Sequence, residues 1–310
     1  MRNLLKRNYC YSLIVLCCIA FVSIPSHSLG TEIHRDNRNV TVTEENKLQT
    51  ERQDSIAFVK AKWTEKKLAS GAKLRYAQIH LFNSIQSISV LIYPAKHYAT
   101  HILQADKAGT TSELAKSVNA EFAINGSFFN MDNREPVTFV MVDKQIKGVN
   151  KLNENEKWIN GILLINQTNN RCHIDIRPYE PNEWEIIRKN YTSALVSGPV
   201  LMTNHKIPSF SNTKRHPRTI IGTTAKGKEV IMLVIDGRFK GKADGVSFEE
   251  SATIARYLKM ENVLNLDGGG SSTLWTKELG VVNYPCDNHL FDHAGERKVS
   301  NIVYVSRVHQ

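Results

Sequence analysis

The sequence is short of acidic residues. Against 40 lysines and arginines it has 30 aspartates and glutamates, which gives the 310-residue chain a formal net charge of +10. No nucleic-acid-binding motif accompanies this excess, so the charge does not indicate a nucleic acid partner. Hydrophobic residues make up 41% of the chain and charged residues 23%. These values exclude a disordered, collagen-like or disulfide-knot chain and predict a globular core.

The sequence also lacks an apolar run of the roughly 20 residues that a membrane-spanning helix needs. Its longest run, Leu13–Ile24, follows a short segment with three basic residues and no acid, and small residues follow at 26–28. This pattern is typical of a secretory signal peptide. We therefore expect residues 1–28 to be cleaved near Ser28, leaving a mature chain of net charge +7. We expect that chain to be periplasmic or secreted, without stable membrane insertion.

Cysteines are scarce beyond the predicted signal peptide, where only Cys172 and Cys286 remain. In an oxidising compartment these two residues form either one disulfide or two buried thiols. No CxxC, HExxH or histidine-rich spacing indicates a zinc site.

The rest of the chain divides by composition into a leader and one domain. Residues 29–54 are polar and hold few large apolar side chains, so we expect a flexible leader. For residues 55–310 we expect a single mixed α+β domain, strand-rich, with several helices packed on the sheet and no internal repeat. Helices are expected from 56 to near 71 and at 110–118, 182–189 and 247–259; strands are expected at 73–80, 85–93, 121–125, 136–142, 158–165, 194–203, 218–223, 230–235 and 263–266.

A run of three glycines marks the loop after the last of these strands. Adjacent glycines lose much backbone entropy on folding, which is tolerated where the chain turns sharply or lies close to a ligand. With the hydroxyl residues that follow, they form either a flexible turn or a nest of N–H and O–H donors suited to a phosphate. The candidate binding residues of this loop are Gly268, Gly269, Gly270, Ser271 and Ser272.

Two carboxylates follow two apolar strands. Asp236 begins the sequence Asp236-Gly237-Arg238 after strand 230–235, and Asp267 follows strand 263–266. If the strand ends converge, one carboxyl can be ionised while the other is protonated, as glycosyl transfer to water requires. The alternative is that Asp236 and Arg238 form a surface ion pair.

Three arginines, Arg218, Arg238 and Arg297, lie next to a strand or a glycine turn. A planar guanidinium binds a phosphate through two parallel hydrogen bonds, which lysine cannot do. Each arginine is either a solvated surface charge or part of an anion site. The segment Asn125–Asn130 is likewise either a sugar-binding loop or a turn with core phenylalanines.

Two familiar catalytic motifs are absent. Gly222–Lys228 matches the start of a P-loop, but Glu229 replaces the required serine or threonine and a strand follows where a helix is needed. No Gly-x-Ser-x-Gly elbow is present, so an activated serine nucleophile has no support.

Taken together, the motifs resemble the phosphodiester glycosidase family. The resemblance runs from about residue 75 to the C-terminus, with the family motifs from about residue 120, and Ser127 replaces a glycine that is usual in the first motif. The matching segments are Asn125–Asn130, Ser197–Leu201, His216–Thr219 with Gly222, Asp236–Arg238, Gly245–Leu258, Asn265–Thr273 and Glu296–Asn301.

The resemblance implies hydrolysis of the C1–O bond of a sugar-1-phosphodiester, such as a GlcNAc-1-phosphodiester, with release of free sugar and a phosphomonoester. Phosphate is a good leaving group once its charge is held, and the oxocarbenium-like sugar needs a carboxylate beneath it or a base to activate water. The resemblance assigns phosphate binding to Arg218, Arg238 and Arg297 with the loop donors. It assigns a sugar hydroxyl to Asn125.

The same resemblance makes Asp236 and Asp267 the candidates for nucleophile, acid or base, with Glu249 as a third, and leaves their roles open. A divalent cation at Asp267 or Asp236 is neither indicated nor excluded by ligand spacing. Two other functions stay open. One is a secreted protein that binds a glycan or associates with an exopolysaccharide without catalysis, and the other is a metal-dependent phosphodiesterase that cleaves P–O instead of C–O.

Overall fold

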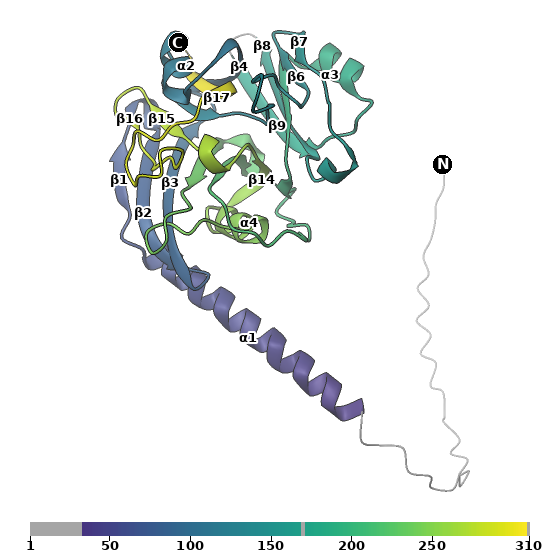
Figure 1. Cartoon of the computed structure of the whole chain (residues 1–310), viewed down its shortest axis with the longest axis vertical. Helices are drawn as coiled ribbons and strands as arrows, with labels where there is room; N and C mark the ends of the chain where they lie inside the picture. The colour runs from purple at the N-terminus through teal and green to yellow at the C-terminus, as the bar shows by residue number, and fades with distance from the viewer. Residues whose placement is uncertain (1–32, 169–170, 309–310) are drawn as a thin grey trace, which may run out of the picture. The chain divides into compact units, whose positions relative to one another are not determined.

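The computed structural model describes residues 33–168 and 171–308 (Figure 1). The predicted signal peptide lies outside these residues. Within the two described ranges, no helix is both long enough and apolar enough to cross a membrane. The chain divides into two compact units, residues 1–48 and 49–310.

The described part of the first unit is helical. Residues 33–48 are the first part of α1 (Ile33–Lys60), whose remaining residues belong to the second unit. Much of the segment expected to be a flexible leader is therefore helix, which glutamate, lysine, glutamine and arginine favour even without an apolar face. The helix ends at Lys60 and does not reach Gly71, because strand β1 begins at Thr64.

The second unit is built from three antiparallel sheets and is an α+β fold, as predicted. The first sheet has the order β1 (Thr64–Lys67), β2 (Lys73–Leu81), β3 (Ser84–Pro94), β13 (Glu229–Ile235), β12 (Arg218–Thr224), β14 (Met260–Asn265), β11 (Val200–Met202). The second has the order β7 (Gln145–Gly148), β6 (Val140–Val142), β10 (Ser193–Ser197), β8 (Gly161–Thr168), β9 (Arg171–Pro178). The third has the order β16 (Gly280–Val281), β15 (Leu274–Thr276), β5 (Phe122–Asn125), β17 (Val299–Arg307), β4 (Tyr98–Gly109).

Apolar runs on both faces of the first sheet explain how it carries two cores. Along β13, Met232 and Val234 face a core shared by all three sheets, while Ile231 and Leu233 face a second core with helix α4 (Phe248–Tyr257). A strand that alternates sides in this way is buried on both faces, and its sequence reads as a continuous apolar run. Helix α2 (Thr111–Ser117) packs on the third sheet and α3 (Trp184–Asn190) on the second (Figure 1).

The strand predicted at 194–203 is two strands, β10 and β11, separated by Gly198-Pro199, whose peptide bond is cis. Strands β4, β9 and β17 were not predicted. Polar residues interrupt β4 and β9, so no long apolar run marks them in the sequence, whereas β17 contains a short apolar run at 302–305 and was missed nonetheless.

Candidate active site

The ends of several strands meet at one edge of the first sheet. Strand β12 lies between β13 and β14 and is antiparallel to both, so its start lies beside the ends of β13 and β14. Asp236 and Asp267 follow these two ends. Asn283 joins their loops, because its Nδ2 donates to Asp236 Oδ1 at 2.9 Å and to the carbonyl of Ser272 at 3.1 Å. The two carboxylate-bearing loops therefore belong to one site.

Asn125, at the end of β5, connects the third sheet to the same edge. Its Nδ2 donates to the carbonyl of Asp267 at 2.7 Å, and its Oδ1 accepts from the Thr219 hydroxyl at 2.7 Å and from the Thr273 amide at 3.1 Å. The Asp267 amide in turn donates to the carbonyl of Gly126 at 3.0 Å. Asn125 has no exposed surface, and these contacts use both ends of its amide. Its contacts hold the glycine loop in place.

Asp236 is buried, with 1% of its surface exposed, and is surrounded by donors. Ser87 Oγ donates to Oδ2 at 2.6 Å, and Oδ1 accepts from Asn283 and from the amide of Tyr284 at 3.0 Å. Burial raises the pKa of this carboxyl to about 6, although the hydrogen bonds from Ser87 and Asn283 oppose the shift. Asp236 connects strand β3, strand β13 and the 283–284 segment.

This raised pKa predicts a pH-dependent stability that Asp236→Asn removes. A carboxyl whose pKa rises from 3.8 to about 6 on folding stabilises the protein fully below pH 3.8, and that stabilisation is lost as the pH rises through 6. The difference corresponds to about 3 kcal/mol. The asparagine variant should therefore gain about that much free energy of unfolding relative to wild type between pH 4 and pH 7, measured by urea denaturation. If the difference in free energy of unfolding between the variant and wild type stayed constant across this pH range, the raised pKa of Asp236 would be contradicted.

Asp267 differs from Asp236 in being only half-buried and in having two arginines near enough to act on its carboxyl. Burial raises the pKa of its carboxyl to about 6, while Ser271, Arg297, the Gly268 amide and Arg238 act to lower it. Desolvation and positive charge thus have opposite effects on the pKa of this partly exposed carboxylate, and desolvation is the larger. The combination places the Asp267 pKa close to the pH range in which a carboxylate can work as a base or nucleophile.

The two arginines lie against the glycine loop. A Cβ on Gly269 would lie 2.8 Å from Arg238 Nη2, and a Cβ on Gly270 would meet Arg297 Nη2 and Asp287 Oδ1. Gly269 has a φ of +62°, which favours glycine, whereas a side chain at either position would have to displace the ends of these flexible side chains. Arg238 and Arg297 therefore border the loop that Asp267 begins.

The segment between β16 and β17 adds residues that the sequence did not indicate. Arg297 donates through Nε and Nη2 to Asp287 Oδ1, at 3.0 and 2.5 Å. Arg238 Nη1 lies 3.8 Å from Cys286 Sγ, and burial is the main reason that the pKa of this thiol is raised. Only the three-dimensional structure brings Cys286 and Asp287 to the glycine loop.

Arg218 is placed differently from the other two arginines. It is 6% exposed, its Cζ lies 4.0 Å from the centre of the Phe248 ring, and it donates to the carbonyls of Val246 and Lys214, both at 3.0 Å. Burial lowers its pKa to about 10, so it stays charged at neutral pH. Its charge and that of Arg238 both lower the pKa of His216, after burial as the main cause.

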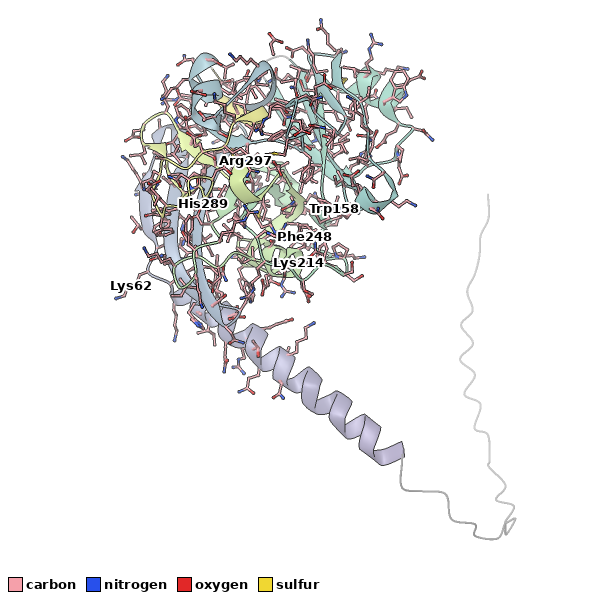
Figure 2. All side chains as sticks on the ribbon, in the orientation of Figure 1. Lys62, Trp158, Lys214, Phe248, His289 and Arg297 are labelled. Carbon is pink, nitrogen blue, oxygen red and sulfur yellow. The ribbon has the colours of Figure 1, made fainter. Side chains whose placement is uncertain are left out.

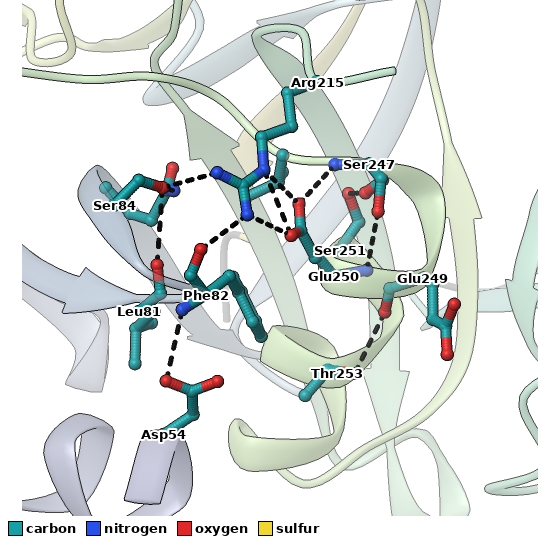
Figure 3. A network of polar contacts seen from close by, with 12 residues as sticks. Asp54, Leu81, Phe82, Ser84, Arg215, Ser247, Glu249, Glu250, Ser251 and Thr253 are labelled. Carbon is teal, nitrogen blue, oxygen red and sulfur yellow. Dashed lines mark hydrogen bonds and ion pairs between the residues drawn. The ribbon is translucent and has the colours of Figure 1, made fainter. Parts of the chain in front are cut away.

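A polar network fixes the start of α4 (Figure 3). Phe248, whose ring lies beneath Arg218, is the first residue of this helix. Arg215 donates to the Glu250 carboxylate, to Ser84 Oγ at 2.7 Å and to the carbonyl of Phe82 at 2.6 Å. Glu250 also accepts from the amide of Ser247 at 2.8 Å, and Ser247 caps the helix. Glu249 is exposed, and its side chain points away from Arg215 in this view.

Several donors of the glycine loop are bonded within the protein. The Gly269 amide donates to Pro217, and the amides of Ser271 and Ser272 donate back into the loop. Gly268 and Gly269 are partly exposed, whereas Gly270, Ser271 and Ser272 are buried. The accessible positive charge at this edge is that of the arginine side chains.

The described residues contain no group of three or more His, Cys, Asp or Glu side chains arranged to hold a metal ion. Cys172 and Cys286, the cysteines of the described residues, are free thiols and not a disulfide. Cys172 lies on β9, where its Sγ accepts a hydrogen bond from the Thr100 amide at 3.3 Å. Cys286 lies in a different segment, between β16 and β17.

The domain is thus a strand-rich α+β fold in which Arg238 and Arg297 both act on the carboxyl of Asp267. A model of one family, phosphodiester glycosidase, matches residues 118–306. The chain belongs to this family, as the motifs predicted. A comparison with curated proteins finds no match.

Solved structures share the fold at low sequence identity. A hypothetical protein from Synechocystis is 13% identical with a TM-score of 0.62, covering 80% of this chain; the chain spans 64% of that protein's length. The catalytic domain of zebrafish N-acetylglucosamine-1-phosphodiester alpha-N-acetylglucosaminidase is 15% identical with a TM-score of 0.55, over 80% of this chain and 81% of that one. A putative exported protein from Burkholderia pseudomallei is 14% identical with a TM-score of 0.55, over 73% and 75%.

Proposed function

We propose that the protein is a glycosidase of the extracytoplasmic space that hydrolyses the C1–O bond of a sugar-1-phosphodiester. The observation that carries the proposal is the half-buried Asp267 carboxylate, whose pKa is influenced by both Arg238 and Arg297. Family membership supports the reaction type. The predicted signal peptide and the similarity in fold to an exported protein support the location.

In the proposed reaction the two arginines bind the phosphodiester and neutralise the charge that gathers on it as the bond from C1 breaks. The phosphate leaves with the bonding electron pair, and its low basicity reduces the need for a strong general acid. Asp267, ionised, either attacks C1 or takes a proton from the attacking water. Water supplies the hydroxyl group that C1 gains, its other proton leaves through Asp267 to solvent or to the released phosphate, and the second product is a phosphomonoester.

The remaining candidate residues receive positioning roles in this proposal. Asp236 holds the 283–284 segment against the glycine loop, Asn125 fixes the Asp267 carbonyl, and Gly268–Ser272 form the turn that brings Asp267 to the arginines. Arg218 stabilises the neighbouring loops through Val246 and Lys214 and adds positive charge. Glu249, exposed at the start of α4, remains a third candidate carboxylate.

Hydrolysis in oxygen-18 water tests the bond that is cut. We expect the label in the released sugar, detected by mass spectrometry after incubation with an N-acetylhexosamine or hexose 1-phosphodiester. Label in the phosphomonoester would show P–O cleavage and support the alternative of a phosphodiesterase. Binding without turnover, unaffected by Asp267→Asn, would support the alternative of a glycan-binding protein.

A further inference from the structure

Trp158 is an exposed aromatic side chain that two other rings hold in place. It is 40% exposed and lies in the segment before β8. Phe128 meets it edge to face, with ring centres 5.2 Å apart at 81°, and Phe248 packs on it at 5.8 Å and 33°. Figure 2 labels Trp158 and Phe248 side by side, in agreement with this distance. The ring is therefore fixed from two sides and still accessible to solvent.

The supports of Trp158 connect it to the candidate active site. A Cβ on Gly198 would lie 2.7 Å from the Trp158 carbonyl, and the Gly198 carbonyl accepts from Asn265 Nδ2 at 2.7 Å, two residues before Asp267. On the other side, the Phe248 ring that contacts Trp158 lies beneath the Arg218 guanidinium. Trp158 thus lies at the edge where the strand ends meet.

This arrangement has the chemistry of a sugar-binding platform. A pyranose ring has an apolar C–H face, and a tryptophan ring that is already immobilised covers such a face at little cost in conformational entropy. Ligand sites commonly combine apolar aromatic walls with a few charged groups that fix orientation. The fixed indole supplies the aromatic wall, and Arg238 and Arg297 at the glycine loop supply the charged groups.

We propose that Trp158, backed by Phe128 and Phe248, stacks on a pyranose ring of the phosphodiester substrate. The inference rests on the proposed function and adds the side chain that contacts the sugar ring of the substrate. The arginines at the glycine loop bind the phosphate, and the indole selects the sugar. Removing the ring should weaken substrate binding and leave the bond-breaking step largely intact.

The chain supplies a matched control in Trp184, which is also 40% exposed but lies on α3 and makes no ring contact among the described residues. We expect Trp158→Ala to raise KM for hexose and N-acetylhexosamine 1-phosphodiesters by about 10-fold with a much smaller change in kcat. Trp158→Phe should restore most of the affinity. Trp184→Ala should change neither constant, and thermal unfolding of each variant will show that the folds are comparable.

A binding measurement separates the two proposals. Calorimetric titration of Asp267→Asn and of Asp267→Asn with Trp158→Ala, using an N-acetylhexosamine 1-phosphodiester as probe, should show the same 10-fold loss without turnover. Equal affinity of the two proteins, together with turnover by wild type, would overturn the stacking proposal and leave the glycosidase proposal standing. Absence of both binding and turnover for every pyranose 1-phosphodiester would overturn both.

Discussion

Replacing Asp267 with asparagine is expected to lower kcat for a sugar-1-phosphodiester by about 10³-fold, the range in which a positioned acid, base or nucleophile contributes. The fold should persist, because residue 267 is held by two hydrogen bonds of its main chain that the substitution leaves in place. Its amide donates to Gly126 and its carbonyl accepts from Asn125. Release of reducing sugar measures the loss, and far-ultraviolet circular dichroism confirms the fold.

The pH profile of the wild-type enzyme is part of the same prediction. The proposed role needs Asp267 ionised, and burial raises its pKa to about 6. The value of kcat/KM should therefore rise with pH up to about 6 and level off above it. Asp106→Asn, at an exposed aspartate of β4, is the control and should be without effect. Full activity of Asp267→Asn, or a profile that falls through pH 6, would remove Asp267 from the proposed role.

Arg297→Ala is expected to raise KM by about 10²-fold, because a truncated charge pair in a partly desolvated site typically costs a few kcal/mol. Arg297→Lys should recover only part of this, since an ammonium group cannot form two parallel hydrogen bonds to a phosphate. Initial rates across a substrate concentration series separate KM from kcat.

The matched control is Arg307→Ala at the end of β17, the strand that follows Arg297. Arg307 pairs with Glu121 at 2.8 Å, and its side chain is 46% exposed, so its loss should have little effect. Asp287→Asn provides the complementary test, because the Asp287 carboxylate competes with the phosphate for Arg297 in this structure. It should lower KM. An unchanged KM in both Arg297→Ala and Asp287→Asn would show that the phosphate is bound elsewhere.

The helices and strands that were predicted correctly are those whose own residues determine the type of element. The apolar run of β13 indicates a buried strand, and the Ser247–Glu250 capping box indicates the start of helix α4. Strand β4 carries polar residues on its less buried positions, and its pairing with β17 is what makes it a strand. A pairing between distant segments has no local signature.

The candidate site shows the same division between local and distant signals. The glycine loop and the carboxylates that follow two strands are visible as motifs, and the family resemblance groups them. Asn283 and Asp287 could not be found in this way, because they lie in an irregular segment whose neighbours come from elsewhere in the chain. The sequence motif indicated Asn125 as a site residue, but it did not indicate that Asn125 is buried and hydrogen-bonded within the protein.

The hydrogen bonds of Asn125 also have a kinetic meaning. Its amide joins residues that lie 94, 142 and 148 positions away along the chain. Closing loops of this length is slow compared with forming a helix or hairpin, so contacts of high sequence separation are completed late in folding. The surroundings of Asp267 are therefore assembled only when both the middle and the end of the chain have found their places. The appearance of activity during refolding would follow the last of these long-range pairings and not the formation of the individual sheets.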